Sequence, residues 1–119
     1  MITLKKNEVV PALFLIAGFK QTGEMVSGLL TEALPLSLKR RLQKIREDLM
    51  KHQVELAKDS DQIEKECSTE ADKERKEQEL KVLFDEEIKI DRDKVSLAMI
   101  EAITTSNNYD FSLIEKIAE

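Results

Sequence analysis

The sequence predicts a mostly α protein, in which an antiparallel, coiled-coil-like helical hairpin projects from a small α+β head with a two-stranded ribbon. Three observations predict this fold class. The chain of 119 residues has only three Gly and two Pro, one stretch keeps a heptad spacing of apolar residues, and two short runs alternate apolar with polar residues. The length fits a single domain, with the head formed by 1–35 and 85–119 and the hairpin by 36–84.

The first residues predict a short strand followed by a helix. Ile2 and Leu4 alternate with polar residues, as in a strand with one buried face. Asn7 is a suitable N-cap for a helix over about 8–20. A second short helix is expected over 24–34, and Pro35 ends it because the residue before a proline disfavours helical geometry.

The longest apolar run, Val9–Ala17, bears on cellular location. Nine residues are too few to cross a bilayer, which takes about 20 in a helix. Lys5 and Lys6 precede this run as in a signal peptide, but Phe19 and Lys20 follow it where small residues would mark cleavage. We therefore expect a buried helix, no membrane partner and a cytoplasmic protein.

The heptad spacing predicts a long helix that starts near residue 36. Six positions are spaced by 4, 3, 4, 3 and 4 residues, which is the a/d pattern of a coiled coil. We call these positions the seam: Leu38, Leu42, Ile45, Leu49, His52 and Leu56. His52 is interpreted as a polar seam residue that fixes the register of packing.

The hairpin needs a turn, and two positions qualify. A turn at 59–61 gives arms of equal length, 36–58 and 62–84, and is the preferred position. The alternative is a turn at 67–69, which Ile63 favours because it stays in phase with the seam. The second arm is highly charged and is expected to be solvated.

A second alternating run near the C-terminal third predicts the partner of the first strand. In residues 86–91, Ile88 and Ile90 lie on one face. We expect them to pair with Ile2 and Leu4 in a two-stranded ribbon that packs on the first helix, since an isolated ribbon is marginal in water.

The last part of the chain predicts two short helices. Asp93 is the expected cap of a helix that extends to Ile103, and Thr104–Asn108 is the expected loop. Either Asp110 or Ser112 is expected to cap the final helix.

No pattern in the chain indicates an enzyme or a cofactor. Phosphate-binding glycine loops, zinc-protease motifs and cysteine pairs are missing from the sequence. One Cys and one His cannot build a zinc site, and Cys67 is interpreted as a passive, exposed thiol. The carboxylates of 85–93 are explained as solvated strand ends and a helix cap, so we expect no metal.

The charge distribution argues against nucleic acid as a partner. The net charge is −5, with ten Lys or Arg against seven Asp or Glu in residues 1–60 and nine against seventeen in the rest. The basic stretch 39–46, which includes Arg40 and Arg41, is expected to pair across the hairpin with the acidic arm. With the turn at 59–61, Arg41 would face Glu79.

The seam predicts an interface. The arm 62–84 offers too few apolar residues to cover it, and an exposed apolar stripe of this length marks a binding surface. We therefore expect a homo-oligomer or a protein partner that binds the seam together with Arg40 and Arg41.

The order of parts also suggests a family. The segments ITLKKNEVVPALFLI, LFDEEIKID and YDFSLIEKIAE enclose a long charged hairpin. This layout resembles a family of small proteins of unknown function encoded by tailed bacteriophages and prophages. The resemblance implies a strand and short helix, a long basic helix, an acidic arm, a second strand and a small C-terminal helix, and it implies no catalytic residues.

These observations predict a non-enzymatic structural or assembly protein, with a phage virion component as the implied setting. Two alternatives remain open. One is a chaperone-like holdase that uses the hairpin and the apolar head, and the other is a regulatory module that binds nucleic acid through residues 39–46.

Overall fold

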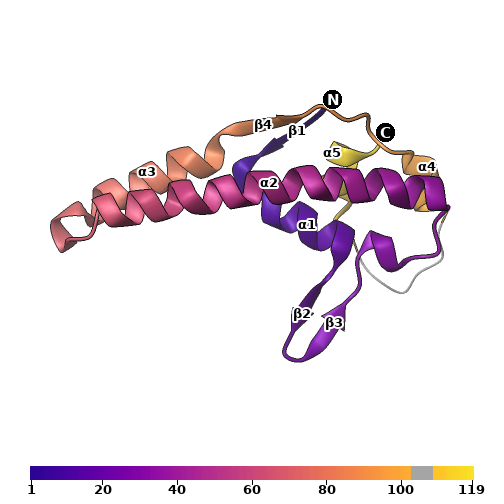
Figure 1. The fold of residues 1–119 in the computed structure, drawn as a ribbon, viewed down its shortest axis with the longest axis horizontal. Coiled ribbons are helices and arrows are strands. Elements are labelled where there is room, and N and C mark those ends of the chain that lie inside the picture. Colours follow the sequence, from indigo (N-terminus) through magenta and orange to yellow (C-terminus); the bar gives the residue numbers. More distant parts are fainter. Residues whose placement is uncertain (103–108) are drawn as a thin grey trace.

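A computed structural model describes residues 1–102 and 109–119 of the chain. The protein is mostly helical, and a long helical hairpin projects from a small head, as the sequence predicts (Figure 1). The helices are α1 (Val9–Ala17), α2 (Leu36–Glu66), α3 (Lys73–Asp85), α4 (Leu97–Glu101) and α5 (Phe111–Ile117). The strands are β1 (Ile2–Lys5), β2 (Phe19–Gln21), β3 (Glu24–Val26) and β4 (Glu87–Ile90).

The hairpin turn lies at 67–69, so the preferred turn at 59–61 is wrong. Helix α2 runs for 31 residues, about 46 Å, without a break at the polar segment around residue 60. Asp59, Ser60 and Asp61 are tolerated because they lie on the exposed or half-exposed side of the helix. The two arms are therefore unequal, since α3 has only 13 residues.

The ribbon of the head has the predicted partners. β1 and β4 are antiparallel, with Ile2 opposite Ile90 and Leu4 opposite Ile88. All four side chains are buried, whereas the alternate positions of both strands are exposed. The ribbon thus turns one apolar face into the core.

Residues 19–26 form a β-hairpin, which corrects the helix predicted over 24–34. Strands β2 and β3 pair antiparallel, and Thr22 and Gly23 both have positive φ in the turn between them. Two positive φ values are typical of tight hairpin turns whose twist matches that of the strands. Only one turn of 3₁₀ helix, Leu29–Thr31, remains of the predicted helix.

The C-terminal part begins differently from the prediction. α4 starts at Leu97 with Ser96, not Asp93, as its N-cap, because Val95 is held in a parallel bridge with Ala118. Asp110 caps α5 by accepting hydrogen bonds from the N–H groups of Ser112 and Leu113, as one of the two predicted caps. Ile103 and the loop predicted over 104–108 lie outside the described residues.

The core of the head uses the first part of the seam. Leu38, Leu42, Ile45 and Leu49 are at most 3 % exposed and belong to the apolar cluster that α1, the ribbon and α5 complete. The expectation that the seam lies uncovered is therefore wrong. Beyond the head, the buried apolar residues are few: Leu56 on α2, Cys67 at the turn and Leu83 on α3.

Candidate interaction site

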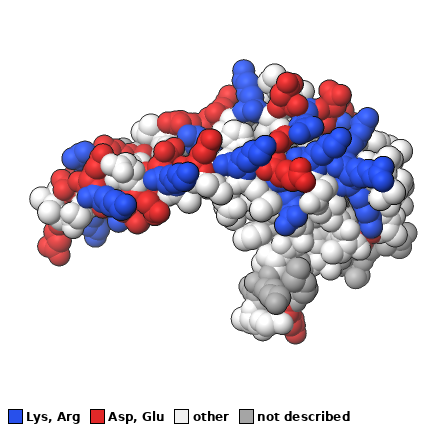
Figure 2. Space-filling view, viewed as in Figure 1, with Lys and Arg blue, Asp and Glu red and all other residues white. Residues whose placement is uncertain are grey.

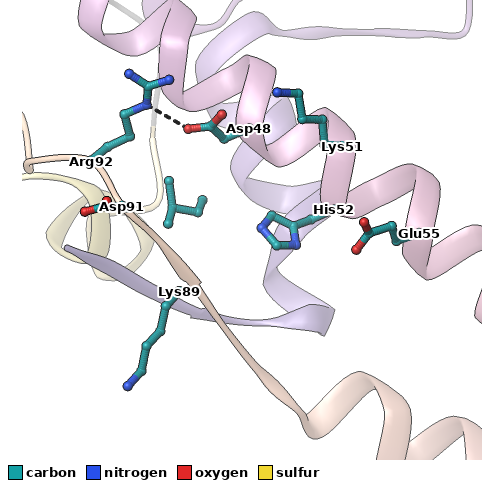
Figure 3. Close-up of a pocket in the computed structure, with 8 residues that line it drawn as sticks. Asp48, Lys51, His52, Glu55, Lys89, Asp91 and Arg92 are labelled. Carbon is teal, nitrogen blue, oxygen red and sulfur yellow. Dashed lines mark hydrogen bonds and ion pairs between the residues drawn. The ribbon is translucent and has the colours of Figure 1, made fainter.

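A hollow of the described surface lies between α2 and the end of β4. Its volume is about 410 Å³, and Figure 3 shows its charged side chains coming from both walls. The lining residues are Asp48, Lys51, His52, Glu55, Lys89, Ile90, Asp91 and Arg92. Helix α2 supplies one wall because residues 48, 51, 52 and 55 share one helical face.

One ion pair closes an end of this cleft. The Nε atom of Arg92 lies 2.8 Å from a carboxylate oxygen of Asp48. The hydrogen bond and the charge of Asp48 raise the pKa of Arg92 above its ordinary value. Because only Nε is engaged, the terminal nitrogens of the guanidinium point away from Asp48 and remain on the surface (Figure 3).

A second hollow of about 210 Å³ adjoins the same arginine. Arg41, Lys44, Ile45, Arg92 and Asp93 line it. Among the described residues, no ion pair includes Arg41 or Lys44, so both are free to meet an anion. Arg92 is already paired with Asp48, so two unpaired cations, Arg41 and Lys44, stand against the one carboxylate of Asp93 and make this end of the cleft positive.

His52 lies in the cleft and not at a packed helix interface. Its side chain is half-buried, and it makes no hydrogen bond or ion pair with any described residue. The prediction that His52 fixes the register of helix packing is therefore wrong. Asp48 and Glu55 lie one turn away on either side, as expected from their spacing, but Asp48 is engaged by Arg92.

The predicted interaction residues separate into two groups. Leu38, Leu42, Ile45, Leu49 and Leu56 are buried within this chain and offer no surface to a partner. Arg40 and Arg41 are exposed on α2. Sequence reasoning missed Arg92 and Lys89, although the alternation around Ile88 and Ile90 already placed Lys89 on the outer face of the strand.

The predicted charge pairs across the hairpin do not form. Glu79 pairs with Arg75 on its own helix, and Glu64 of α2 pairs with Lys76 of α3 at 3.7 Å. The turn at 67–69 places α3 beside the distal half of α2. The basic stretch 39–46, in the proximal half, therefore has no acidic arm opposite it.

This geometry makes the balance of charge uneven along the molecule, with Lys and Arg interspersed among the Asp and Glu of the arm (Figure 2). We define the basic region as residues 39–51 and 89–94, which hold nine Lys or Arg against four Asp or Glu. We define the acidic arm as residues 53–86, which hold twelve Asp or Glu against six Lys or Arg. A protein of net charge −5 thus carries a surface of net charge +5.

Cys67 is buried at the hairpin turn, not exposed as predicted. Its side chain is 4 % exposed, and its sulfur lies 3.6 Å from a carboxylate oxygen of Glu79. Burial raises the pKa of this thiol; Arg75 opposes the shift and Glu79 adds to it. An undissociated thiol is a poor nucleophile and a poor metal ligand.

An apolar hollow of about 260 Å³ lies beside α1, between that helix and the start of α5. Phe14 and Phe19, whose ring centroids are 4.6 Å apart, form part of its wall. Phe14 is 44 % exposed, which is high for an aromatic side chain.

The described residues lack two features, a cluster of metal ligands and a membrane-spanning helix. No group of three or more His, Cys, Asp or Glu side chains is placed to hold a metal ion. No helix there has both the length and the apolar composition needed to cross a bilayer.

The chain was also compared with known proteins. No family model, no curated protein and no solved structure matches it.

Proposed function

We propose that this chain is a non-enzymatic assembly protein that binds other proteins through its charged surfaces. The observation that supports this proposal is the separation of a basic region from an acidic arm on one rigid, 31-residue helix. Complementary potentials steer partners and set their orientation more than they add affinity. Such a surface suits a protein that places partners relative to one another.

The elongated shape supports the same function. The molecule measures 53 × 35 × 21 Å, and the hairpin provides much of the long dimension (Figure 1). Only three apolar residues of the projecting arm are buried, namely Leu56, Cys67 and Leu83. An arm of this kind extends the reach of the head and presents charge at a distance from it.

The setting that we propose is a phage or prophage virion. The test is mass spectrometry of purified particles from cells that produce this chain. We expect the chain in particles at a constant ratio to the major structural proteins. Its presence in the cell lysate combined with its absence from particles would contradict the virion proposal and favour a transient assembly factor.

Nucleic acid binding is the second candidate function, because the five cations of residues 39–46 take part in no ion pair between described residues. Fluorescence anisotropy with a labelled duplex of about 20 base pairs tests it. A binder that neutralises several phosphates should lose affinity steeply with salt, with a logarithmic slope of about −0.9 per phosphate. Binding that is absent at low salt would exclude this candidate.

A further inference from the structure

The acidic arm cannot reach the basic region of its own chain. Residues 39–51 of the basic region and the first part of the arm lie on α2, which continues from the head into the arm as one uninterrupted helix of about 46 Å. A helix of that kind holds its two halves apart, because folding one back on the other would break its hydrogen bonds. The opposite charges of the chain are therefore separated by its own backbone.

Both surfaces carry charges that the fold leaves without partners. Arg41 and Lys44 are exposed and form no ion pair within the described chain. The same holds in the arm for Asp61 and Glu77, which are exposed on α2 and α3. These groups are available to a second molecule.

The two surfaces have comparable lengths. The basic region follows α2 for about 18 Å from Lys39 to Lys51, and the part of α2 in the acidic arm extends about 20 Å from residue 53 to Glu66. The arm is narrow because only two helices form it. Its carboxylates can lie along the cleft. There Asp48 holds the guanidinium of Arg92 in place, and its terminal N–H groups can donate charge-assisted hydrogen bonds to a carboxylate.

We infer that the acidic arm of one copy docks on the basic region of a second copy, along the cleft between α2 and β4. The interface is heterologous, since one surface of the molecule meets a different surface of the next. This inference rests on the proposed assembly function and names a second copy as one partner of that function. It predicts self-association that is driven by charge and weakened by salt.

The first test is the molar mass of the purified chain by light scattering, at about 50 mM and about 500 mM NaCl, where screening differs strongly. At low salt the mass should rise above 13.7 kDa with concentration, and at high salt it should return to the monomer value. A mass of 13.7 kDa at low salt and several hundred micromolar protein would overturn the inference.

The second test uses two variants that each disable one surface. Arg41→Glu/Lys44→Glu reverses charge on the basic region, and Asp61→Lys/Glu77→Lys reverses charge on the arm. Each variant alone should stay monomeric at low salt. Mixed together they should form a one-to-one dimer, because the intact arm of the first variant can dock on the intact basic region of the second.

A matched control distinguishes the effect of the charges on the arm from the effect of the net charge of the chain. Glu101→Lys/Glu115→Lys changes the net charge by the same amount at exposed positions in α4 and α5, and it should associate like the unchanged chain. Circular dichroism melts establish that every variant is folded. If the unchanged chain associates but the mixed variants remain monomers, another surface is responsible and the inference is wrong. The particle experiment is independent of this result, so the two proposals can fail separately.

Discussion

Gly28 lies where the chain has no room for a side chain. A Cβ atom there would be 2.3 Å from the backbone nitrogen of Gly18 and 2.6 Å from the carbonyl carbon of Ala17. Both neighbours are backbone atoms at the end of α1, so they cannot move aside as a flexible side chain would. The close approach lets the segment after β3 pack directly on the first helix.

We therefore expect Gly28→Ala to lower the free energy of unfolding by at least about 2 kcal/mol, measured by urea denaturation. Gly23→Ala is the matched control. Its Cβ would meet open space, and only the positive φ of 82° would cost about 1 kcal/mol. Equal and small effects of both substitutions would contradict the packing at Gly28.

Glu8 links three parts of the head. Its carboxylate accepts a hydrogen bond from the N–H of Lys5 at 2.9 Å and pairs with Lys116 of α5. Partial burial alone would raise its pKa, but the contacts with Lys116 and Lys5 together lower that pKa from the ordinary 4.5. A carboxylate whose pKa is lower in the folded state than in the unfolded state stabilises the fold fully when the pH is above the unfolded-state pKa. This stabilisation is lost as the pH falls through the folded-state pKa.

We predict that Glu8→Gln lowers the free energy of unfolding by about 0.5–1 kcal/mol near pH 7. The difference from the unchanged chain should shrink as pH falls through the lowered pKa of the Glu8 carboxyl and vanish once that group is protonated. Urea titrations at pH 7 and at a series of lower pH values measure this. Glu115→Gln, on the exposed side of α5, should show no such pH dependence, and a constant difference for Glu8→Gln would argue against the lowered pKa.

At the scale of single elements, α2 serves two structures at once. Its first half is the central helix of the head, and its second half is one side of the arm. The heptad pattern runs through both halves without a change in spacing, but the residues that cover it differ. α1 and the ribbon cover the first half, while α3 covers the second.

Substitutions at Leu42 and Val54 test whether the seam is part of the core or an exposed interface. Leu42→Ala should cost about 2–5 kcal/mol, because the side chain is fully buried in the head. Val54→Ala should cost less than about 0.5 kcal/mol, because the side chain is 55 % exposed. Thermal melts of the two variants suffice, and a mild effect at Leu42 would mean that the seam is not part of the core.

The turn position makes a separate prediction about charge coupling. A double-mutant cycle on Glu64 and Lys76 should give a coupling of about 0.2–1 kcal/mol at low salt, as for other exposed pairs. The same cycle on Arg41 and Glu79 should give none, since the turn at 67–69 removes α3 from the basic stretch. Coupling between Arg41 and Glu79 would instead support a turn at 59–61.

At the scale of the whole molecule, stability is expected to be uneven. The radius of gyration is 16.5 Å, whereas a compact chain of this length has about 13–14 Å. The excess comes from an arm with few buried apolar residues. Regions of that kind open locally at low free energy while the core stays closed.

Hydrogen exchange should resolve this difference. We expect amides of α3 to exchange about 100-fold faster or more than amides of α2 between Leu42 and Leu49. Mass spectrometry of peptides from both regions measures the rates. Uniform protection along the chain would mean that the arm and the head unfold as one unit.

The sequence by itself determined the elements whose signal is local. Alternation at Ile2, Leu4, Ile88 and Ile90 predicted both strands of the ribbon and their pairing, because a period of two places one face in the core. The seam predicted the long helix, and Asp110 was one of two predicted caps for the last helix. Length and composition predicted the mostly helical fold class.

Tertiary structure decided what covers those elements. Helical periodicity marks the buried side of a helix but does not identify the element that packs on it. The sequence therefore predicted that a second chain covers the seam, whereas α1 and the ribbon of the same chain cover it. The turn was misplaced because Asp59 and Asp61 resemble a break, yet polar residues are stable on the solvent side of a helix. The cleft was missed because Arg92 and Asp48 meet only once that turn is formed. Distances along the chain cannot show which charges the fold brings together and which it keeps apart.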